Sequence, residues 1–526
     1  MTRLTLEQAP VLVVGAGIMG AGIAQVAAQA GHPVFLFDAR AGAAAEAKTK
    51  LLATLQSLVA KGRLSDQAAQ DCAAKVEPIS ELAQASGVRL AIEAIVENLD
   101  AKQSLMRSLE SLLPAEAILA TNTSSISVTA IASGLQHPER VVGMHFFNPV
   151  PLMKLVEVVS GLQTDRSVAE TIFALSQHWG KVPVYAKSTP GFIVNRIARP
   201  YYAETLALLQ EQAAEPAVLD ACLQAAGFRM GPCELMDLIG HDTNFAVTQS
   251  VYEANFFDKR YVPSLVQREL VAGGLLGRKT NHGLYRYPRA GQSNSSGSAA
   301  ATDTPFPPTR VSVHGNDPIA NDLATRLSAR WGGVFERVLA SDWCGIEIDT
   351  ARLMLSDGRC ASDIAAQRRR QQASADIAVF DRFDPALASL ANQTPSATTT
   401  PGRLSLAYAC AEGASDHWQH EAPSWLNLLG FEPVRLTDVP GLIVTRTLAM
   451  LINEAADAVN QGVCSPEGAD AAMKLGVNYP GGPFEWLANW SAQAVSDILL
   501  ALDAVYGGER YRVSPWLRRR ASSEIR

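Results

Sequence analysis

The chain has 526 residues, of which 48% are hydrophobic and 18% charged, and its formal net charge is −7. It is too long for one hydrophobic core, so we expect several domains of an ordinary globular protein. The absence of any basic block disfavours a nucleic-acid partner, and we expect no membrane or targeting segment. The seven cysteines are scattered without metal-ligand spacing, which predicts free thiols in a reducing cytoplasm and no metal site.

The first predicted element is a buried strand at Val11–Val14, followed directly by an Ala-rich helical pattern. Gly15, Gly17 and Gly20 form G-x-G-x-x-G where the two meet. In such a loop the first glycine permits a tight turn, the second lets a pyrophosphate approach the backbone, and the third lets helix and strand pack closely. The free N–H groups at the start of the helix would bind the phosphates. A tight turn without a nucleotide is the alternative.

A second predicted strand ends near Asp38, whose carboxylate is placed to accept hydrogen bonds from an adenine ribose. The same carboxylate would repel a 2′-phosphate, so NAD is favoured over NADP, although Arg40 lies close in sequence. Because strand, glycines, helix, strand and acid occur in order, the pattern predicts a dinucleotide site.

Residues 40–75 carry apolar residues at helical spacing and predict an amphipathic helix. Apolar runs at 90–98, 117–125 and 140–151 predict further strands of the sheet, and residues 152–161 follow. Polar side chains stand near the ends of these runs. Ligands bind at the carboxyl ends of the strands in doubly wound sheets, so these side chains are candidates for the site.

His145 and Glu157 are the candidate acid–base pair. A histidine can take or return a proton near neutral pH, and a carboxylate partner fixes its tautomer and stabilises the imidazolium. Ser124 and Asn195 are candidates to orient a substrate hydroxyl by hydrogen bonds. Together they suit an alcohol that loses a hydride to the dinucleotide.

The sequence pattern divides the chain into several predicted regions. We predict an α/β Rossmann-type doubly wound sheet at 1–187, an all-α domain at 188–290, and a Gly/Ser/Pro/Thr-rich linker at 291–309. A degenerate Rossmann-like α/β region at 310–437 and a second all-α domain at 438–526 follow. A second Pro/Thr-rich break covers 392–402.

The two all-α domains are predicted to be copies, because matching residues recur at one offset of 250 (440 − 190). The pairs are Pro190 with Pro440, Arg196 with Arg446, Glu204 with Glu454, and Asp220 with Asp470. Thr445 stands where Asn195 would be, and residues 404–413 are interpreted as the counterpart of the strand that carries His145, without the histidine. The sequence therefore predicts one active site per chain.

Six motifs occur in an order that resembles the short-chain L-3-hydroxyacyl-CoA dehydrogenases: VLVVGAGIMGAGIAQ, AIVENLDAK, TNTSS, HFFNPVPLMKLVEVV, TPGFIVNRI and GLLGRKTNHGLYRY. The resemblance runs from Val11 to about Pro288, and the helical repeat resembles the family's C-terminal domain again. Length and duplication resemble the long bacterial form, associated with phenylacetate catabolism and 3-hydroxyadipyl-CoA. The resemblance implies oxidation of (S)-3-hydroxyacyl-CoA to 3-ketoacyl-CoA, as in fatty acid β-oxidation.

The resemblance also implies roles for individual positions. The residues expected to bind NAD are Gly15, Gly17, Ile18, Met19, Gly20, Asp38, Glu97, Lys102, Ser124, Asn148 and Lys279. Those expected to bind the CoA substrate are Thr54, Lys61, Ser124 and Asn148. Those expected to be catalytic are His145, Glu157, Ser124 and Asn195.

The second helical domain is expected to pack against the first in place of a partner subunit, which leaves a further homo-oligomer open. Two other functions stay open. A dehydrogenase of the same fold could act on a hydroxy acid without CoA, or the chain could be a catalytically retired dinucleotide-binding protein. The intact His145, Glu157, Ser124 and Asn195 favour the acyl-CoA dehydrogenase.

Overall fold

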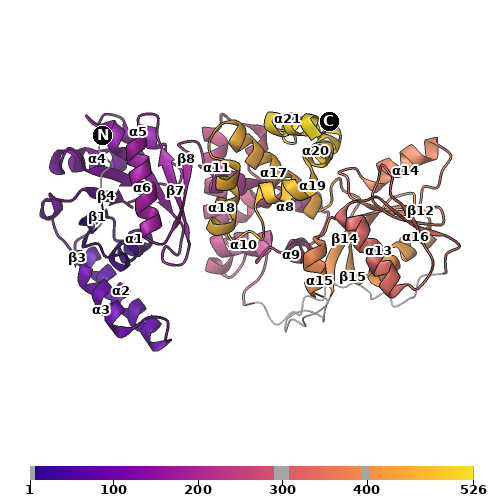
Figure 1. Cartoon of the computed structure of the whole chain (residues 1–526), viewed down its shortest axis with the longest axis horizontal. Helices are drawn as coiled ribbons and strands as arrows, with labels where there is room; N and C mark the ends of the chain where they lie inside the picture. The colour runs from indigo at the N-terminus through magenta and orange to yellow at the C-terminus, as the bar shows by residue number, and fades with distance from the viewer. Residues whose placement is uncertain (1–5, 7, 289–306, 392–402, 525–526) are drawn as a thin grey trace. The chain divides into compact units, whose positions relative to one another are not determined.

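The computed structural model describes residues 6, 8–288, 307–391 and 403–524, which form two compact units (Figure 1). The first unit contains residues up to Ile197 together with Ala458–Phe484, and the second contains Ala198–Asp457 and Glu485–Arg526. The predicted break at 392–402, and the predicted linker up to residue 306, lie outside the described residues.

The first unit is built on a sheet of eight described strands, in the order β3-β2-β1-β4-β5-β6-β7-β8. Every neighbouring pair is parallel except β6 and β7, which are antiparallel. The strands are β1 (Val11–Val14), β2 (Val34–Phe37), β3 (Val76–Pro78), β4 (Leu90–Glu93), β5 (Ile118–Thr121), β6 (Val141–Phe146), β7 (Leu155–Ser160) and β8 (Val182–Lys187). The predicted doubly wound sheet is confirmed.

Helices cover this sheet and complete its core. Residues of α1 (Ile18–Gln29) and α6 (Arg166–His178) join alternate residues of the central strands in one hydrophobic cluster. Helices α4 (Leu99–Leu112) and α5 (Val128–Ala132) contact β5 and β6 outside that cluster. Because both faces are covered, the strands read as continuous apolar runs, as in β1.

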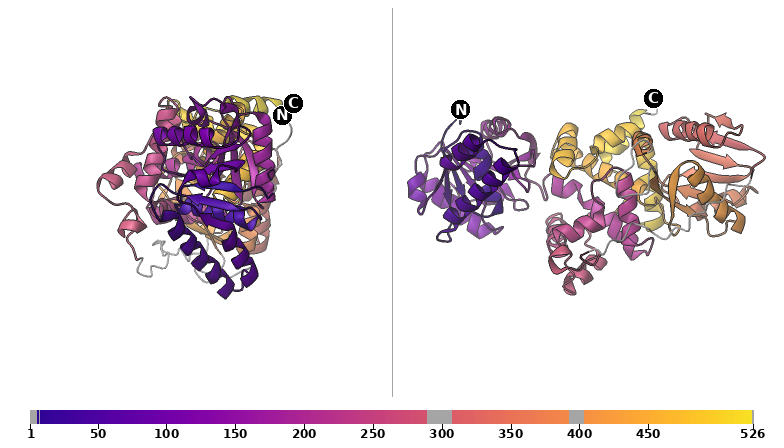
Figure 2. Two further views of the ribbon diagram at one scale, coloured as in Figure 1. Left: turned by 90° about the vertical axis from the view of Figure 1, so that its left-hand side faces the viewer. Right: turned by 90° about the horizontal axis from the view of Figure 1, so that it is seen from below.

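The amphipathic segment 40–75 forms two helices, where the sequence had predicted one. Helix α2 (Ala43–Ala60) ends before Gly62, whose φ is +66°, and α3 (Asp66–Lys75) starts after Ser65. The Ser65 hydroxyl accepts a hydrogen bond from the Ala68 N–H, so a helix cap interrupts the apolar periodicity. In Figure 1 and in the left-hand view of Figure 2, the α2–α3 pair extends downward, away from the sheet.

The first unit also contains a helix from the far end of the sequence. Helix α18 (Pro466–Gly476) packs against β7, β8 and the short helix α7 (Val194–Ile197). Contact is close at Gly476, where an added Cβ would lie 2.7 Å from a methyl group of Leu155. A helix of the second helical copy thus covers the last strands of the first sheet.

The second unit holds most of the predicted helical residues. Its helices from the first copy are α8 (Arg199–Gln210), α9 (Pro216–Ala225), α10 (Pro232–Ile239), α11 (His241–Ala254) and α12 (Leu265–Ala272). Those from the second are α17 (Val444–Asn460), α19 (Pro483–Trp490), α20 (Ala492–Tyr506) and α21 (Pro515–Glu524). No helix among the described residues is long and apolar enough to cross a bilayer.

The two helical copies share local structure as well as sequence. Asp220 accepts a hydrogen bond from the Cys233 N–H at 2.8 Å, and Asp470 accepts one from the Phe484 N–H at 2.8 Å. The glycine before the first helix has a φ of +74° in one copy and +72° in the other. These matching hydrogen bonds and turns support the predicted duplication.

The second unit contains a sheet of seven described strands in the order β10-β9-β11-β12-β13-β14-β15. The strands are β9 (Val311–His314), β10 (Glu336–Val338), β11 (Gly345–Ile348), β12 (Ala351–Leu355), β13 (Ile377–Phe380), β14 (Leu404–Cys410) and β15 (Phe431–Arg435). Helices α13 (Pro318–Arg330), α14 (Ala361–Arg370), α15 (Pro385–Ala391) and α16 (Asp416–Leu428) accompany them (orange in Figure 1).

The strand directions show that one interpretation of the sequence was wrong, namely that residues 404–413 are the counterpart of the strand that carries His145. Strand β14 is antiparallel to β13 and parallel to β15, as β7 is antiparallel to β6 and parallel to β8. Residues 404–410 therefore correspond to β7, and β13 corresponds to the strand that carries His145. The apolar pattern alone could not distinguish the two, because it carries no information on strand direction.

Candidate active site

The centre of the candidate site is a buried pair on two adjacent antiparallel strands. His145 on β6 lies directly opposite Glu157 on β7, and His145 Nδ1 is 2.5 Å from Glu157 Oε2. The His145 side chain is 7% exposed and that of Glu157 is fully buried. Aromatic rings flank the imidazole, with the Phe147 ring centroid at 4.6 Å. The strand register therefore aligns the two side chains.

Glu157 also binds the chain where it enters the helical region. Its second oxygen, Oε1, accepts hydrogen bonds from the Ile193 and Val194 N–H groups, each at 3.0 Å. With both carboxylate oxygens engaged, the side chain has one orientation. Nδ1 of His145 thus faces a fixed acceptor, which leaves Nε2 as the nitrogen able to exchange a proton with a ligand.

Ser124 and Asn195 come together beside this pair, as predicted. The Asn195 side-chain amide donates to the Ser124 carbonyl oxygen at 3.4 Å, so the loop after β5 meets α7. Both residues are partly exposed. Each therefore keeps polar groups that a ligand can reach.

Glu97 organises the loop that carries Ser124. One of its oxygens accepts hydrogen bonds from the Ser124 and Ser125 N–H groups, each at 3.0 Å, and from the Thr123 hydroxyl at 2.7 Å. Burial raises the pKa of Glu97, but the Lys102 ammonium and these hydrogen bonds outweigh burial and lower it to about 2. Glu97 is therefore a charged anchor for the loop.

Lys102, which is also expected to contact NAD, belongs to helix α4 and lies beneath the loop that carries Ser124. Its side chain is 1% exposed, and its ammonium is 2.7 Å from Glu93 and 3.2 Å from Glu97. In this arrangement Lys102 neutralises two carboxylates beneath the loop. A direct contact with NAD stays a prediction for both Glu97 and Lys102.

The glycine loop fits a bound pyrophosphate. Gly15 has a φ of +106°, and an added Cβ on Gly20 would lie 1.8 Å from the Gly15 carbonyl oxygen. Gly17 begins α1 without any side-chain cap, and an added Cβ there would meet no atom within 4 Å. The fold therefore requires glycine at positions 15 and 20, whereas the space beside Gly17 and the free N–H groups of α1 suit a phosphate. Ile18, 79% exposed, and Met19 lie in the same turn.

Asp38 lies at the end of β2 and faces this loop. Its carboxylate accepts hydrogen bonds from the Ala16 N–H at 2.7 Å and from the Arg40 N–H at 2.9 Å. The Arg40 guanidinium is paired with Glu46 at 2.7 Å. These residues fit NAD.

A groove of about 620 Å³ opens between α1, α2 and the loop after β6. Thr54 and Asn148, both expected to contact CoA, line this groove. Lys61 is exposed just after the end of α2. The groove wall is supported by Lys181, whose buried ammonium donates to the Val150 carbonyl at 2.5 Å and whose pKa burial lowers to about 8. Sequence reasoning missed Lys181, because a lone lysine near the end of the domain belongs to no motif.

Lys279 belongs to the second unit, where its ammonium pairs with the carboxylate of Asp242. Its predicted contact with NAD stays a prediction. In the first unit the structure pairs His145 with Glu157, joins Ser124 to Asn195, and places Thr54 and Asn148 on one groove.

The second sheet repeats the glycine turn but not its binding features. Gly315 follows β9 with a φ of +99°, and α13 begins three residues later, as α1 does after Gly15. Asp317 stands where the first half has Gly17, and its carboxylate accepts the Ala320 N–H at 2.7 Å. Pro318 removes another N–H from the first turn. A carboxylate of the chain itself thus occupies the place of a phosphate.

The counterpart of the His145–Glu157 pair is a single carboxylate. Asp381 follows β13 and accepts hydrogen bonds from the Ile443 and Val444 N–H groups, at 2.9 and 2.6 Å. These are the amides that correspond to those bound by Glu157. Asp381 also accepts from the Thr445 hydroxyl at 2.7 Å, and burial raises its pKa. The second half keeps the helix anchor and lacks the histidine.

A dinucleotide loop beside a buried His–Glu pair defines the chain as an NAD-dependent dehydrogenase. Residues 10–189 match the family model of the 3-hydroxyacyl-CoA dehydrogenase NAD binding domain. Residues 191–287 and 441–524 both match the C-terminal domain of the same family, which confirms the duplication. The chain belongs to the 3-hydroxyacyl-CoA dehydrogenase family.

Individual relatives agree with this assignment. A 3-hydroxyadipyl-CoA dehydrogenase of Escherichia coli (strain K12) is 41% identical over 98% of each chain. The mitochondrial hydroxyacyl-coenzyme A dehydrogenase of Sus scrofa is 39% identical over 53% of this chain and 90% of its own. A solved structure of 3-hydroxybutyryl-CoA dehydrogenase from Escherichia coli K12 superposes with a TM-score of 0.84 at 39% identity, covering 98% of this chain and 99% of that one.

Proposed function

We propose that the chain oxidises the 3-hydroxyl of an (S)-3-hydroxyacyl-CoA to a 3-keto group at a single site centred on His145. The observation that carries this proposal is the buried contact of 2.5 Å between His145 and Glu157. A base held in one tautomer beside a dinucleotide loop suits removal of a hydroxyl proton. The family membership supplies the substrate class.

Each side chain then has one task. His145 Nε2 accepts the proton of the 3-hydroxyl, while Glu157 holds Nδ1 and stabilises the imidazolium that forms. Asn195 and Ser124 orient the hydroxyl. NAD, when bound to the glycine loop and Asp38, supplies a hydride acceptor for C3. The Phe147 ring excludes water from the imidazole.

We propose that the acyl part is a short chain, and that the preferred substrate is 3-hydroxyadipyl-CoA. The full-length relative named for that substrate supports the choice, while a solved relative is named for 3-hydroxybutyryl-CoA. Comparing kcat/KM for the two CoA esters decides between them. A higher value for the butyryl ester would overturn the adipyl assignment.

The activity itself is tested by following NADH absorbance with either ester and NAD. We expect turnover with the full chain and inhibition by acetoacetyl-CoA, which resembles the product. Turnover of a free hydroxy acid without inhibition by acetoacetyl-CoA would favour a dehydrogenase that does not use CoA. Tight NADH binding without turnover of either ester would favour a retired protein.

We also propose that the two halves form an internal pseudo-dimer. Helix α18 of the second copy packs on β7 and β8, and α9 of the first copy packs on β14, the counterpart of β7. Within the second unit, Glu204 accepts from the Tyr511 hydroxyl at 3.0 Å, and Glu454 accepts from the Tyr261 hydroxyl at 2.6 Å. These reciprocal contacts support an exchange of elements between copies. A chain truncated after residue 290 that remains a stable, active monomer would contradict the proposal.

None of the seven cysteines forms a disulfide, which supports our proposal that the enzyme works in the reducing cytoplasm. Activity measured with and without a thiol reductant tests part of this proposal. We expect full activity with reductant present and a slow loss without it.

A further inference from the structure

The second unit contains a cavity of about 400 Å³ that the dehydrogenase reaction does not use. It lies where β9 and β13 end, beside α17 and α19, and Asp317 and Arg382 are among its lining residues. Ligands bind at the carboxyl ends of strands in such sheets, so the cavity is the remnant of a binding crevice. Because Asp317 fills the phosphate position, a dinucleotide is excluded from it.

Arg382 is the charged group of this cavity. Its guanidinium carbon lies 4.4 Å from the centre of the Trp490 ring, which holds the group by a cation–π contact. Its Nε is buried and has no hydrogen-bond acceptor, and the Asp317 and Asp381 carboxylates of the described residues attract its charge without forming an ion pair with it. An arginine keeps its charge inside a protein, so the half-buried Arg382, which has no ion-pair partner in the described part of the chain, is stabilised when a ligand completes its hydrogen bonds.

The nearby carboxylates are engaged elsewhere. Asp381 directs its oxygens to the amides of α17 and to the Thr445 hydroxyl, and its hydrogen bonds hold it there. Asp317 caps α13 through the Ala320 N–H. Asp384 accepts the N–H of Ala386 and is exposed. None of them supplies the acceptor that Arg382 lacks.

The other residues that line the cavity indicate which kind of ligand would fit beside the charge of Arg382. Phe383, Leu448, Trp486 and Trp490 give the cavity apolar and aromatic surfaces, and Asn489 adds one amide at its exposed edge. Planar carboxylates match the guanidinium fork by two parallel hydrogen bonds, and flat apolar bodies stack on indole rings. The volume is within the range of small-molecule sites.

We propose that this cavity binds a small organic carboxylate with a flat apolar body, held by Arg382 and packed against Trp490. The site is separate from the NAD-binding loop and from His145, and its occupancy requires neither. Its ligand is recognised by one negative charge on a compact apolar group, which distinguishes it from the acyl-CoA bound in the first unit.

The test is calorimetric titration of the full chain with benzoate as the probe, and with benzyl alcohol as its uncharged match. We expect saturable binding of benzoate and binding of benzyl alcohol at least about tenfold weaker, since a charge-assisted bidentate contact is lost. Inorganic phosphate, which has charge without an apolar body, is expected to compete poorly. Equal binding of benzoate and benzyl alcohol, or no saturable binding of benzoate, would overturn the proposal.

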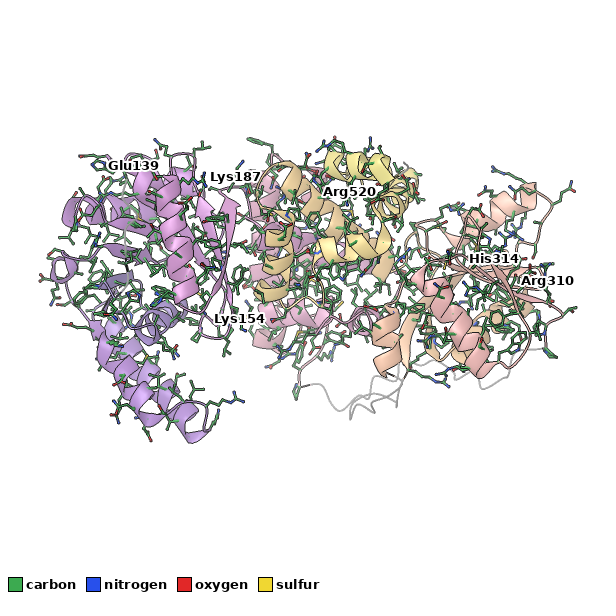
Figure 3. All side chains as sticks on the ribbon, in the orientation of Figure 1. Glu139, Lys154, Lys187, Arg310, His314 and Arg520 are labelled. Carbon is green, nitrogen blue, oxygen red and sulfur yellow. The ribbon has the colours of Figure 1, made fainter. Side chains whose placement is uncertain are left out.

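Variants locate the site. Arg382→Gln should weaken benzoate binding at least about tenfold, whereas Arg310→Gln, at a side chain that is 65% exposed and paired with Glu336, should leave it unchanged (Arg310 is labelled in Figure 3). Asn489→Trp, at an exposed position, should block the cavity without disturbing the core. NADH affinity should be the same in all three variants, which confirms that they fold. Unchanged benzoate binding in Arg382→Gln and Asn489→Trp would contradict the assignment.

Discussion

The two α/β halves of the chain begin alike, with a strand, a tight glycine turn and a helix, and then diverge. Gly15 and Gly315 make the same turn after the first strand, with φ values of +106° and +99°. Two residues later the first half has Gly17, which leaves space and free N–H groups, and the second has Asp317, which fills that space with its own carboxylate. At this turn an internal anion takes the place of an external one, and further along the sheets differ in strand direction, since β11 is antiparallel to β9 and β12.

The catalytic positions differ in the same way. Glu157 and Asp381 both anchor the start of the following helix by its backbone N–H groups. Only Glu157 stands on the neighbouring strand, where its other oxygen can hold a histidine. The anchor is common to both halves, and only the first half adds a histidine, His145, which is the proposed base.

The largest expected difference between the two halves is the effect on kcat of removing the proposed base, His145. His145→Gln should lower kcat by about 10²- to 10⁴-fold, since it removes general base catalysis, while NADH affinity is retained. The matched control is His314→Gln, at the histidine that ends β9 and stacks on Trp343 at 4.2 Å (labelled in Figure 3). It should leave kcat unchanged. Steady-state kinetics with NADH absorbance measures both, and equal losses would remove the distinction between the halves.

The two anchoring carboxylates should respond to neutralisation in opposite ways. Glu157→Gln should lower kcat by about 10²-fold or more, because an amide can no longer stabilise the imidazolium. Asp381→Asn should leave kcat unchanged but lower the free energy of unfolding by about 1–3 kcal/mol, since an amide nitrogen would face backbone N–H donors. Kinetics and urea unfolding of each variant give the comparison. A large loss of kcat in Asp381→Asn would show that the second half takes part in catalysis.

The glycine loop offers a smaller and more selective effect. Gly17 has a φ of −70° and open space around its Cα, so Gly17→Ala should leave the Tm unchanged. The added methyl group would stand in the path of the pyrophosphate and should weaken NADH binding about tenfold or more. Gly20→Ala is the contrasting variant, because its methyl group would clash with the Gly15 carbonyl and lower the Tm as well. Unchanged NADH affinity in Gly17→Ala would contradict the assigned phosphate position.

The smallest effect concerns the pH dependence of the Glu97 anchor. Its pKa of about 2 in the folded chain lies below the ordinary glutamate value, so its charge stabilises the fold above the unfolded pKa of about 4.3. That stabilisation is lost as the pH falls towards 2. The Tm difference between the wild type and Glu97→Gln should therefore narrow between pH 5 and pH 3, as measured by thermal unfolding. A constant difference would mean that the charge of Glu97 does not stabilise the loop.

Local patterns predicted the first half well and the second half in outline. The strand, glycine loop and second strand up to Asp38 follow from short-range sequence rules, and the structure has them as predicted. His145 and Glu157 could be named together from their acid–base chemistry and from one motif that contains both, and the structure pairs them on adjacent strands. Arg382, by contrast, has no sequence signal, since its significance depends on acceptors that other elements fail to provide.

These local sequence rules could not predict which elements pack together over long distances in the chain. Helix α18 repeats the sequence pattern of α9, yet nothing in that pattern says which sheet either helix covers. The exchange is determined by surfaces that only the folded chain presents. The same holds for β14, whose position in the sheet depends on strand direction rather than on the order of apolar runs.

One active site per chain is the central claim, and the stoichiometry of NADH binding tests it most directly. Calorimetric titration of the full chain with NADH should give one molecule bound per chain, and Gly17→Ala should weaken that single event. Two molecules bound per chain would show that the turn at Gly315 still accepts a dinucleotide despite Asp317. That result would contradict the account of the second half.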